Sequence, residues 1–241
     1  EAGAGDADHM DSTDLVSSDY QLHLACYADG ADTSSVLVDG WSTGIDNYIR
    51  VFTPYASADA GASQRHNGTW DGNAYRLEID GTTALEFREA YCRVDGLQVK
   101  VSTSTTEDRG IRLNNIPAGG SALTVSNNII VGDLSGSASD CQGIDIDSGN
   151  ATAYVWNNII YDWVNGTNAN YGIQGSSGTG YVYNNTVYNC RVGYGQVAGT
   201  VYARNNIAQN CNDGFSGSFN AASDHNVSDA AGDAPNASFA G

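Results

Sequence analysis

The chain has 241 residues, enough to bury a core of its own, because a chain of this length hides roughly 70% of its unfolded surface. Its 28 acidic residues against 10 Lys and Arg give a formal net charge of -18, which excludes nucleic acid as an expected partner because phosphates would be repelled. No stretch approaches the roughly 18 apolar residues of a membrane span, so we expect no membrane insertion. Abundant Gly (29) and scarce Pro (3) favour many short strands joined by tight turns.

The first third of the chain is expected to be irregular. Runs of β-branched and aromatic residues predict short strands at 21–26, 35–38, 48–52 and 75–79, and a short helix is expected over 11–17. We predict that residues 1–83 form an N-terminal cap, that residues 84–228 form a regular repeat, and that residues 229–241 form a tail.

A short pattern recurs in the repeat region. It reads LTVSNNII at 123–130, AYVWNNII at 153–160, GYVYNNTV at 180–187 and VYARNNIA at 201–208, with a weaker DHNV at 224–227. A second motif advances with it, as RGIRLNN from Arg109, QGIDID from Gln142, YGIQG from Tyr171, VGYGQ from Val192 and DGFSG from Asp213. Two motifs that advance together by 20 to 33 residues predict a solenoid of stacked coils.

Alternation within each motif predicts strands rather than helices, and therefore an all-β solenoid. One inward column is expected at the valine of the first motif, and a second inward column two residues after the first Asn. The first column comprises Val125, Val155, Val182 and Ala203, and the second comprises Ile129, Ile159, Thr186 and Ile207. A third aligned set comprises Ile111, Ile144, Ile173, Tyr194 and Phe215.

The N-N-[IT]-[IV] motif with stacked aliphatic residues resembles the pectate-lyase-like superfamily of right-handed parallel β-helices, over about residues 84–228. The lead-in resembles that of β-helix proteins from phages and environmental bacteria. The resemblance implies an asparagine ladder that bonds one coil to the next. Its members would be Asn128, Asn158, Asn185 and Asn206, with Asn115 and Asn226 at the ends.

Two carboxylates in the second motif are candidate catalytic residues. Asp145 and Asp147 would point outward on one face about 7 Å apart, which suits the acid and base of an inverting glycosidase. Arg112 precedes this site by one coil and Gln174 follows it, so both would contact a substrate. Two alternatives stay open: Arg112 and Asp145 form a surface ion pair, or Lys100 or Arg112 is the base of a lyase with Ca2+ bound by the two Asp.

Aromatic residues form the second candidate site. The outward positions of the first motif hold Tyr154, Tyr181 and Tyr202 in one column, and Trp156, Tyr183 and Arg204 in the next. Strands about 4.8 Å apart would make these columns a flat platform. It could bind sugar rings or a second subunit, or simply consist of cross-strand pairs facing solvent.

The five cysteines lack the C-x-x-C spacing of a zinc site, and the four histidines share no metal spacing, so no resident metal is expected apart from the possible Ca2+. We expect the thiols to be buried apolar groups, with Cys190 and Cys211 the pair in contact.

Three functions are consistent with these features. The first is an extracellular, cell-surface or virion module of the tail-spike type that binds a polysaccharide or a sister subunit without cleaving it. The resemblance implies a homotrimer or a larger assembly for such a module. The second is a glycoside hydrolase or lyase acting through Asp145 and Asp147. The third is a structural spacer.

Overall fold

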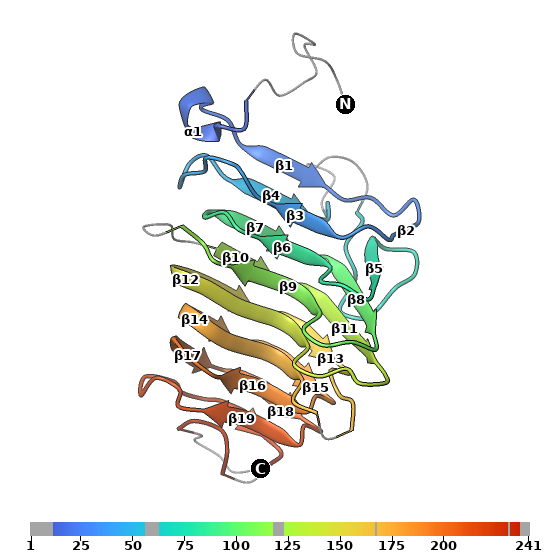
Figure 1. Cartoon of the computed structure of the whole chain (residues 1–241), viewed down its shortest axis with the longest axis vertical. Helices are drawn as coiled ribbons and strands as arrows, with labels where there is room; N and C mark the ends of the chain where they lie inside the picture. Colours follow the sequence, from blue (N-terminus) through green and yellow to red (C-terminus); the bar gives the residue numbers. More distant parts are fainter. Residues whose placement is uncertain (1–11, 56–62, 118–122, 167, 231, 237–241) are drawn as a thin grey trace.

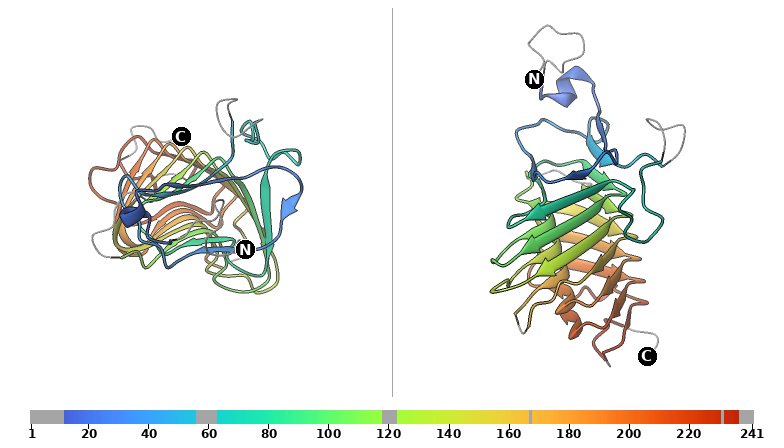
Figure 2. Two further views of the ribbon diagram at one scale, coloured as in Figure 1. Left: turned by 90° about the horizontal axis from the view of Figure 1, so that it is seen from above. Right: turned by 90° about the vertical axis from the view of Figure 1, so that its right-hand side faces the viewer.

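The computed structural model describes residues 12–55, 63–117, 123–166, 168–230 and 232–236. Within these ranges the chain is a parallel β-helix, as predicted: each coil contributes up to three short strands, and equivalent strands stack along the long axis of the molecule (Figure 1). Seen from above, the coils superimpose around a common interior (Figure 2). The strands form a 12-stranded and an 8-stranded sheet, in which every strand pair is parallel.

The three faces of the solenoid correspond to three stacks of strands. The first face comprises β1 (Leu22–Ala25), β4 (Ile49–Phe52), β7 (Cys92–Asp95), β10 (Leu123–Ser126), the later halves of β12 (Gln142–Trp156) and β14 (Tyr171–Tyr183), and β17 (Thr200–Arg204). The second face comprises β2 (Ala31–Asp32), β5 (Arg76–Asp80), β8 (Gln98–Thr103), β11 (Ile129–Leu134), β13 (Ile159–Tyr161), β15 (Thr186–Tyr188), β18 (Ile207–Gln209) and β20 (Val227–Ser228). The third face comprises β3 (Val36–Val38), β6 (Leu85–Phe87), β9 (Arg109–Asn114), the earlier halves of β12 and β14, β16 (Val192–Gln196) and β19 (Asp213–Gly217).

Two of the three predicted columns lie in the core. The valine column on the first face is in register across neighbouring coils and fully buried. The column that contains Ile144 on the third face is also in register and at most 5% exposed. Alternation within a strand therefore identified these inward positions correctly.

The second predicted inward column is wrong. Its members Ile129, Ile159, Thr186 and Ile207 are in register but lie outside the core cluster. Ile129 is buried outside that cluster, Ile159 and Thr186 are half-buried, and Ile207 is 44% exposed. The residues that point inward are the next ones along: Ile130, Ile160, Val187 and Ala208. The first Asn of each pair adopts a left-handed backbone, with φ of 54° to 56°, and this turn shifts the alternation by one residue.

The second Asn of each pair points inward and joins the coils. The side-chain oxygen of Asn158 accepts hydrogen bonds from the main-chain N–H and the side-chain amide of Asn128, at 3.0 and 2.9 Å. Asn185, Asn206 and Asn226 repeat this arrangement down the solenoid. Asn115 is not part of the ladder, because it is exposed in a separate turn after β9, where its N–H donates to the Asp147 carbonyl.

Glycine is required in the second motif by the close approach of neighbouring coils. A Cβ on Gly143 would lie 2.6 Å from the carbonyl oxygen of Gly172 and 2.6 Å from the side chain of Ile160. Gly110 and Gly193 are confined by the next coil in the same way. The x-G-[IYF] pattern therefore reflects a steric limit at this corner.

The lead-in contains the four predicted strands: β1, β3 and β4 are shorter than predicted, and β5 is shifted by one residue. These strands continue the same sheets: β1 pairs with β4, and β4 pairs with β7. The short helix α1 spans Leu15–Ser18, and its Leu15 is fully buried against the core. The predicted helix start at Asp11 lies outside the described residues. The proposed boundaries at 83 and 228 stay predictions.

Candidate functional site: a grooved face and an acidic cluster

Asp145 lies on the third face beneath a cover of polar side chains. It is only 1% exposed, and Arg109 Nε approaches its Oδ2 at 2.9 Å. Arg112 Nε lies 3.5 Å from the same oxygen, and the Ser176 hydroxyl donates to Oδ1 at 2.7 Å. Burial raises the pKa of Asp145, while the hydrogen bond from Ser176 and the charges of the two arginines oppose that rise.

Asp147, two residues on, is tied to the same arginine. Arg112 Nη2 contacts Asp147 Oδ2 at 3.0 Å, and the Ser177 hydroxyl donates to the other oxygen at 2.9 Å. One guanidinium therefore bridges both predicted catalytic carboxylates. Gln174 is in register with Asp145, as predicted, but is 5% exposed and accepts from Ser176.

The cluster is built as an ion-pair network. A carboxylate closed off by two arginines has no free path to a glycosidic oxygen, so Asp147, with 32% of its side chain exposed, is the only one of the pair open to solvent. A catalytic role for the pair stays a prediction. Arg109 was missed by sequence reasoning, although its alignment with Gln142 at the start of the second motif places it one coil away from Asp145.

Lys100, the alternative base proposed for lyase chemistry, is not brought to this cluster. Lys100 lies on β8, on the second face, and pairs with Asp133 at 2.9 Å. Among the described residues, no three His, Cys, Asp or Glu side chains are placed to hold a metal ion.

The tyrosine column on the first face is in register, as the sequence predicts, but it is not a flat platform. Tyr154 and Tyr181 stack with ring centroids 5.2 Å apart and planes 11° apart, and Tyr181 and Tyr202 stack at 4.7 Å and 12°. Tyr181 therefore has a tyrosine on both of its ring faces. The column presents ring edges and hydroxyls outward, because its ring faces cover one another.

The neighbouring column on the same face holds Trp156, Tyr183 and Arg204 in register. Tyr183 meets Tyr181 edge to face at 5.9 Å, and burial raises its pKa, opposed by the nearby charge of Arg204. The guanidinium of Arg204 turns away to donate to the Ala222 carbonyl. Trp156 is half-buried and stacks on no other ring among the described residues.

Trp156 closes one end of a groove of about 450 Å3 on the first face. The groove crosses β4, β7 and β10, and its other lining residues are Arg50, Arg93, Asp95, Thr124, Ser126 and Asn127. Asp95, Ser126 and Trp156 follow one another in a single register column. The groove therefore continues directly into the aromatic columns.

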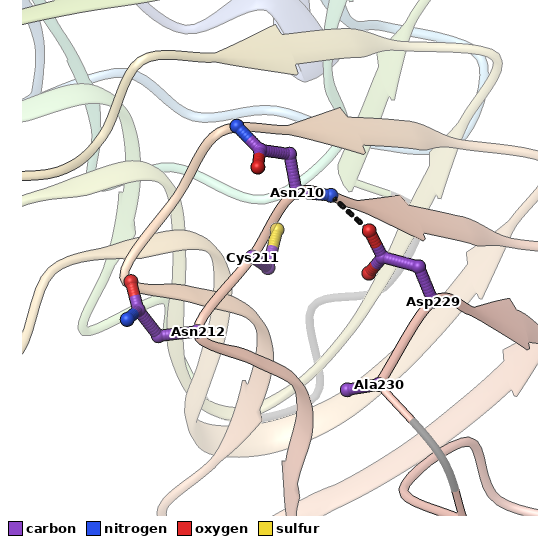
Figure 3. A pocket seen from close by; sticks show the side chains of 5 residues that line it. All are labelled: Asn210, Cys211, Asn212, Asp229 and Ala230. Carbon is purple, nitrogen blue, oxygen red and sulfur yellow. Dashed lines mark hydrogen bonds between the residues drawn. The ribbon is translucent and has the colours of Figure 1, made fainter.

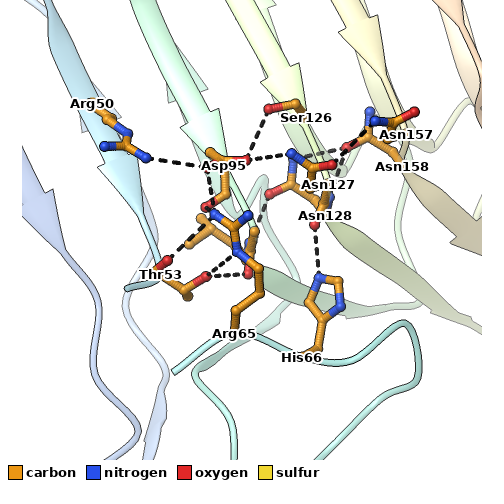
Figure 4. A network of polar contacts seen from close by, with 12 residues as sticks. Arg50, Thr53, Arg65, His66, Asp95, Ser126, Asn127, Asn128, Asn157 and Asn158 are labelled. Carbon is orange, nitrogen blue, oxygen red and sulfur yellow. Dashed lines mark hydrogen bonds and ion pairs between the residues drawn. The ribbon is translucent and has the colours of Figure 1, made fainter. Parts of the chain in front are cut away.

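Asp95, which lines the groove, is held by contacts with four side chains (Figure 4). Asn127 donates to its Oδ1 at 2.7 Å and the Ser126 hydroxyl at 3.1 Å, while Arg50 and Arg65 contact Oδ2. Burial alone would raise the pKa of Asp95, but the bonds from Asn127 and Arg65 lower it below its ordinary value. Asp95 is therefore a fixed acceptor at neutral pH.

The arginines outnumber the acids in this groove. The Arg93 guanidinium lies 3.4 Å from the ring centroid of Tyr48, and that of Arg50 lies 4.0 Å from the centroid of Phe52. Arg93 has no carboxylate partner among the described residues, and Asp95 is shared with Arg50 and Arg65. The groove thus carries local positive charge in a chain of net charge -18.

Sequence reasoning missed this groove because its lining residues come from four successive coils, and a lead-in loop that contains Arg65 and His66 packs beside them. His66 in that loop contacts the Asn127 carbonyl through Nε2 at 2.8 Å, and burial lowers its pKa. The one signal was the vertical alignment of Arg50 with Arg93, which becomes visible only once the irregular coils are in register.

Within the described residues, no helix is long and apolar enough to cross a membrane. Comparison of the chain with protein-family models, with curated proteins and with solved structures finds no match.

Proposed function

We propose that this protein is a glycan-binding β-helix module that holds a polysaccharide without cleaving it, with one sugar in the groove beside Trp156. The observation that carries the proposal is this groove, which combines the indole of Trp156 with fixed polar groups. Its volume lies within the roughly 300 to 1,000 Å3 typical of small-ligand sites.

The chemistry of the lining suits a sugar ring. An indole face packs against the C–H face of a pyranose, while hydroxyl groups require donors and acceptors at fixed positions. Asp95 supplies an acceptor, and Arg93 and Asn127 supply donors from neighbouring coils. Because Asn127 and Asp95 are bonded to each other, little ordering is needed when a ligand binds.

The solenoid supports recognition of a long polymer rather than a single sugar. The groove leads to the hydroxyl edges of the tyrosine column, so further residues of a chain could follow the first face along the axis. The ion pairs that Arg112 makes with both carboxylates of the acidic cluster support binding without cleavage. The resemblance of the lead-in to β-helix proteins of phages and environmental bacteria leads us to place the module outside the cell, on a cell surface or on a virion, as a homotrimer or in a larger assembly.

A glycan array, read for both binding and newly formed reducing ends or unsaturated products, tests the proposal. We expect binding without products, and at least about tenfold weaker binding for Trp156→Ala. The matched control is Tyr188→Ala, since Tyr188 is 45% exposed on the second face, away from the groove.

Each other outcome has a definite meaning. Product release that is lost in Asp147→Asn would identify a polysaccharide-cleaving enzyme. Absence of glycan binding, together with self-association that Trp156→Ala abolishes, would make the first face a subunit contact. Equal losses in Trp156→Ala and Tyr188→Ala would show that the groove is not the binding site.

A further inference from the structure

Cys190 and Cys211 occupy equivalent positions in two neighbouring coils. Tyr188 and Gln209 are paired in register; Cys190 lies two residues after Tyr188, and Cys211 lies two residues after Gln209. The main chains remain bonded there, since Asn189 N–H donates to the Gln209 carbonyl at 3.0 Å and Asn212 N–H to the Cys190 carbonyl at 3.3 Å. Neighbouring strands lie about 4.8 Å apart, within the roughly 4.4 to 6.8 Å between Cα atoms that a disulfide spans.

The two thiols contact each other and differ in access. A side-chain hydrogen bond joins them, while each also lies 3.5 Å from the carbonyl oxygen of the residue two before it. Cys190 is fully buried. Cys211 is partly exposed and lines a hollow of about 260 Å3 with Asn210, Asn212, Asp229 and Ala230 (Figure 3). A small reagent can therefore reach only one of the two sulfur atoms.

The surroundings also favour reaction at Cys211. The hydrogen bond from Cys190 lowers the pKa of Cys211, whereas burial raises the pKa of Cys190. The thiolate is the attacking species in exchange with a disulfide, so the accessible sulfur is also the more readily ionised one. The other cysteines, Cys26, Cys92 and Cys141, have no thiol neighbour among the described residues.

We propose that Cys190 and Cys211 are a redox modification site, at which a low-molecular-weight disulfide converts the dithiol into a covalent link between two coils. The Cys211 thiolate attacks one sulfur of the reagent, forms a mixed disulfide and expels one thiolate. The Cys190 sulfur, on losing its proton, attacks Sγ of Cys211 and expels the second thiolate. The protein loses two hydrogens, and one small disulfide becomes two thiols.

The position gives this link a structural effect. In a solenoid each coil contacts only its neighbours, so stability depends on every interface between coils. The two cysteines lie just after β15 and β18, close to the C-terminal end of the second face (Figure 1). The link would hold the last coils to the solenoid, independently of whether the first face binds a glycan.

The test is treatment of the reduced protein with 2-hydroxyethyl disulfide, followed by trypsin digestion and mass spectrometry. Trypsin cleaves after Arg191 and Arg204, so the two cysteines fall on different peptides. We expect a linked pair of peptides that lacks two hydrogens and is absent in Cys190→Ser. We also expect Tm to rise by about 6 °C or more on oxidation of the wild type.

Cys26→Ser is the matched control, because Cys26 is a partly exposed thiol without a thiol partner. This variant should form the link and gain the same rise in Tm. In Cys190→Ser the reaction should stop at a stable mixed disulfide on Cys211. A mixed disulfide that persists on Cys211 of the wild type, or a Cys211 that does not react, would overturn the proposal.

Discussion

At the scale of single residues, the two asparagines of each repeat have separate roles. The first adopts the left-handed backbone that turns the chain, and the second is buried and bonds to the next coil. Both roles suit Asn, because it tolerates positive φ better than most residues and its amide both donates and accepts. The resemblance to known β-helices predicted the ladder members correctly, but the sequence did not show that the first Asn of each pair makes the turn.

The ladder predicts a large loss of stability for Asn158→Ala. The substitution leaves the buried amide groups of Asn128 without their acceptor, and the carbonyl of Val125 without a donor. Each unpaired buried group costs about 1 to 3 kcal/mol, so we expect the free energy of unfolding to fall by at least about 2 kcal/mol. Urea unfolding followed by circular dichroism measures this change.

The adjacent residue supplies the control. Asn157 is exposed at φ 56°, so Asn157→Gly should keep the turn and change the free energy of unfolding by less than about 0.5 kcal/mol. If both substitutions lower the free energy of unfolding by the same amount, the ladder bonds are not what stabilises the turn between the first and second faces.

At the scale of elements, the columns were predictable where one pattern repeats in every coil. The valine column and the column of Ile144 follow from alternation and from a shared period. The residues of the second face that point inward were not predictable. The left-handed residue before each strand turns the chain and shifts the alternation of inward and outward side chains. The groove around Asp95 was also beyond reach, since its partners Arg50 and Arg65 lie in coils that carry no repeat.

The contribution of the tyrosine column to protein stability can be separated from any contribution to glycan binding. Tyr181 stacks on two rings, and each aromatic pair contributes about 0.5 to 1.5 kcal/mol, so Tyr181→Ala should lower the free energy of unfolding by about 1 to 3 kcal/mol. Glycan binding in the groove should change little, because Trp156 is unaffected. Denaturant titration and the glycan array measure the two effects.

Tyr188→Ala serves as the control here too, because the Tyr188 ring has no aromatic partner among the described residues. This substitution should lower the free energy of unfolding by less than about 0.5 kcal/mol. A greater loss of binding than of stability in Tyr181→Ala would instead place a sugar on the tyrosine column itself.

At the scale of the whole molecule, charge opposes the compact state. With 28 acidic and 10 basic side chains, most carboxylates repel one another across the solenoid surface. The strongest ion pairs are sheltered: the contact of Arg109 with Asp145 is almost fully buried, and salt screens such pairs far less than exposed charges. Added salt should therefore weaken the repulsion more than the attractions.

This balance predicts that Tm rises with ionic strength. The screening length falls from about 30 Å at 0.01 M salt to about 3 Å at 1 M, so surface carboxylates on neighbouring coils should cease to repel. We expect a rise of about 3 to 8 °C over that range of NaCl in a thermal melt, and the same rise in KCl, because screening does not depend on the cation. A rise produced by millimolar CaCl2 alone would instead indicate a specific cation site, and a fall in Tm would show that exposed ion pairs outweigh the repulsion.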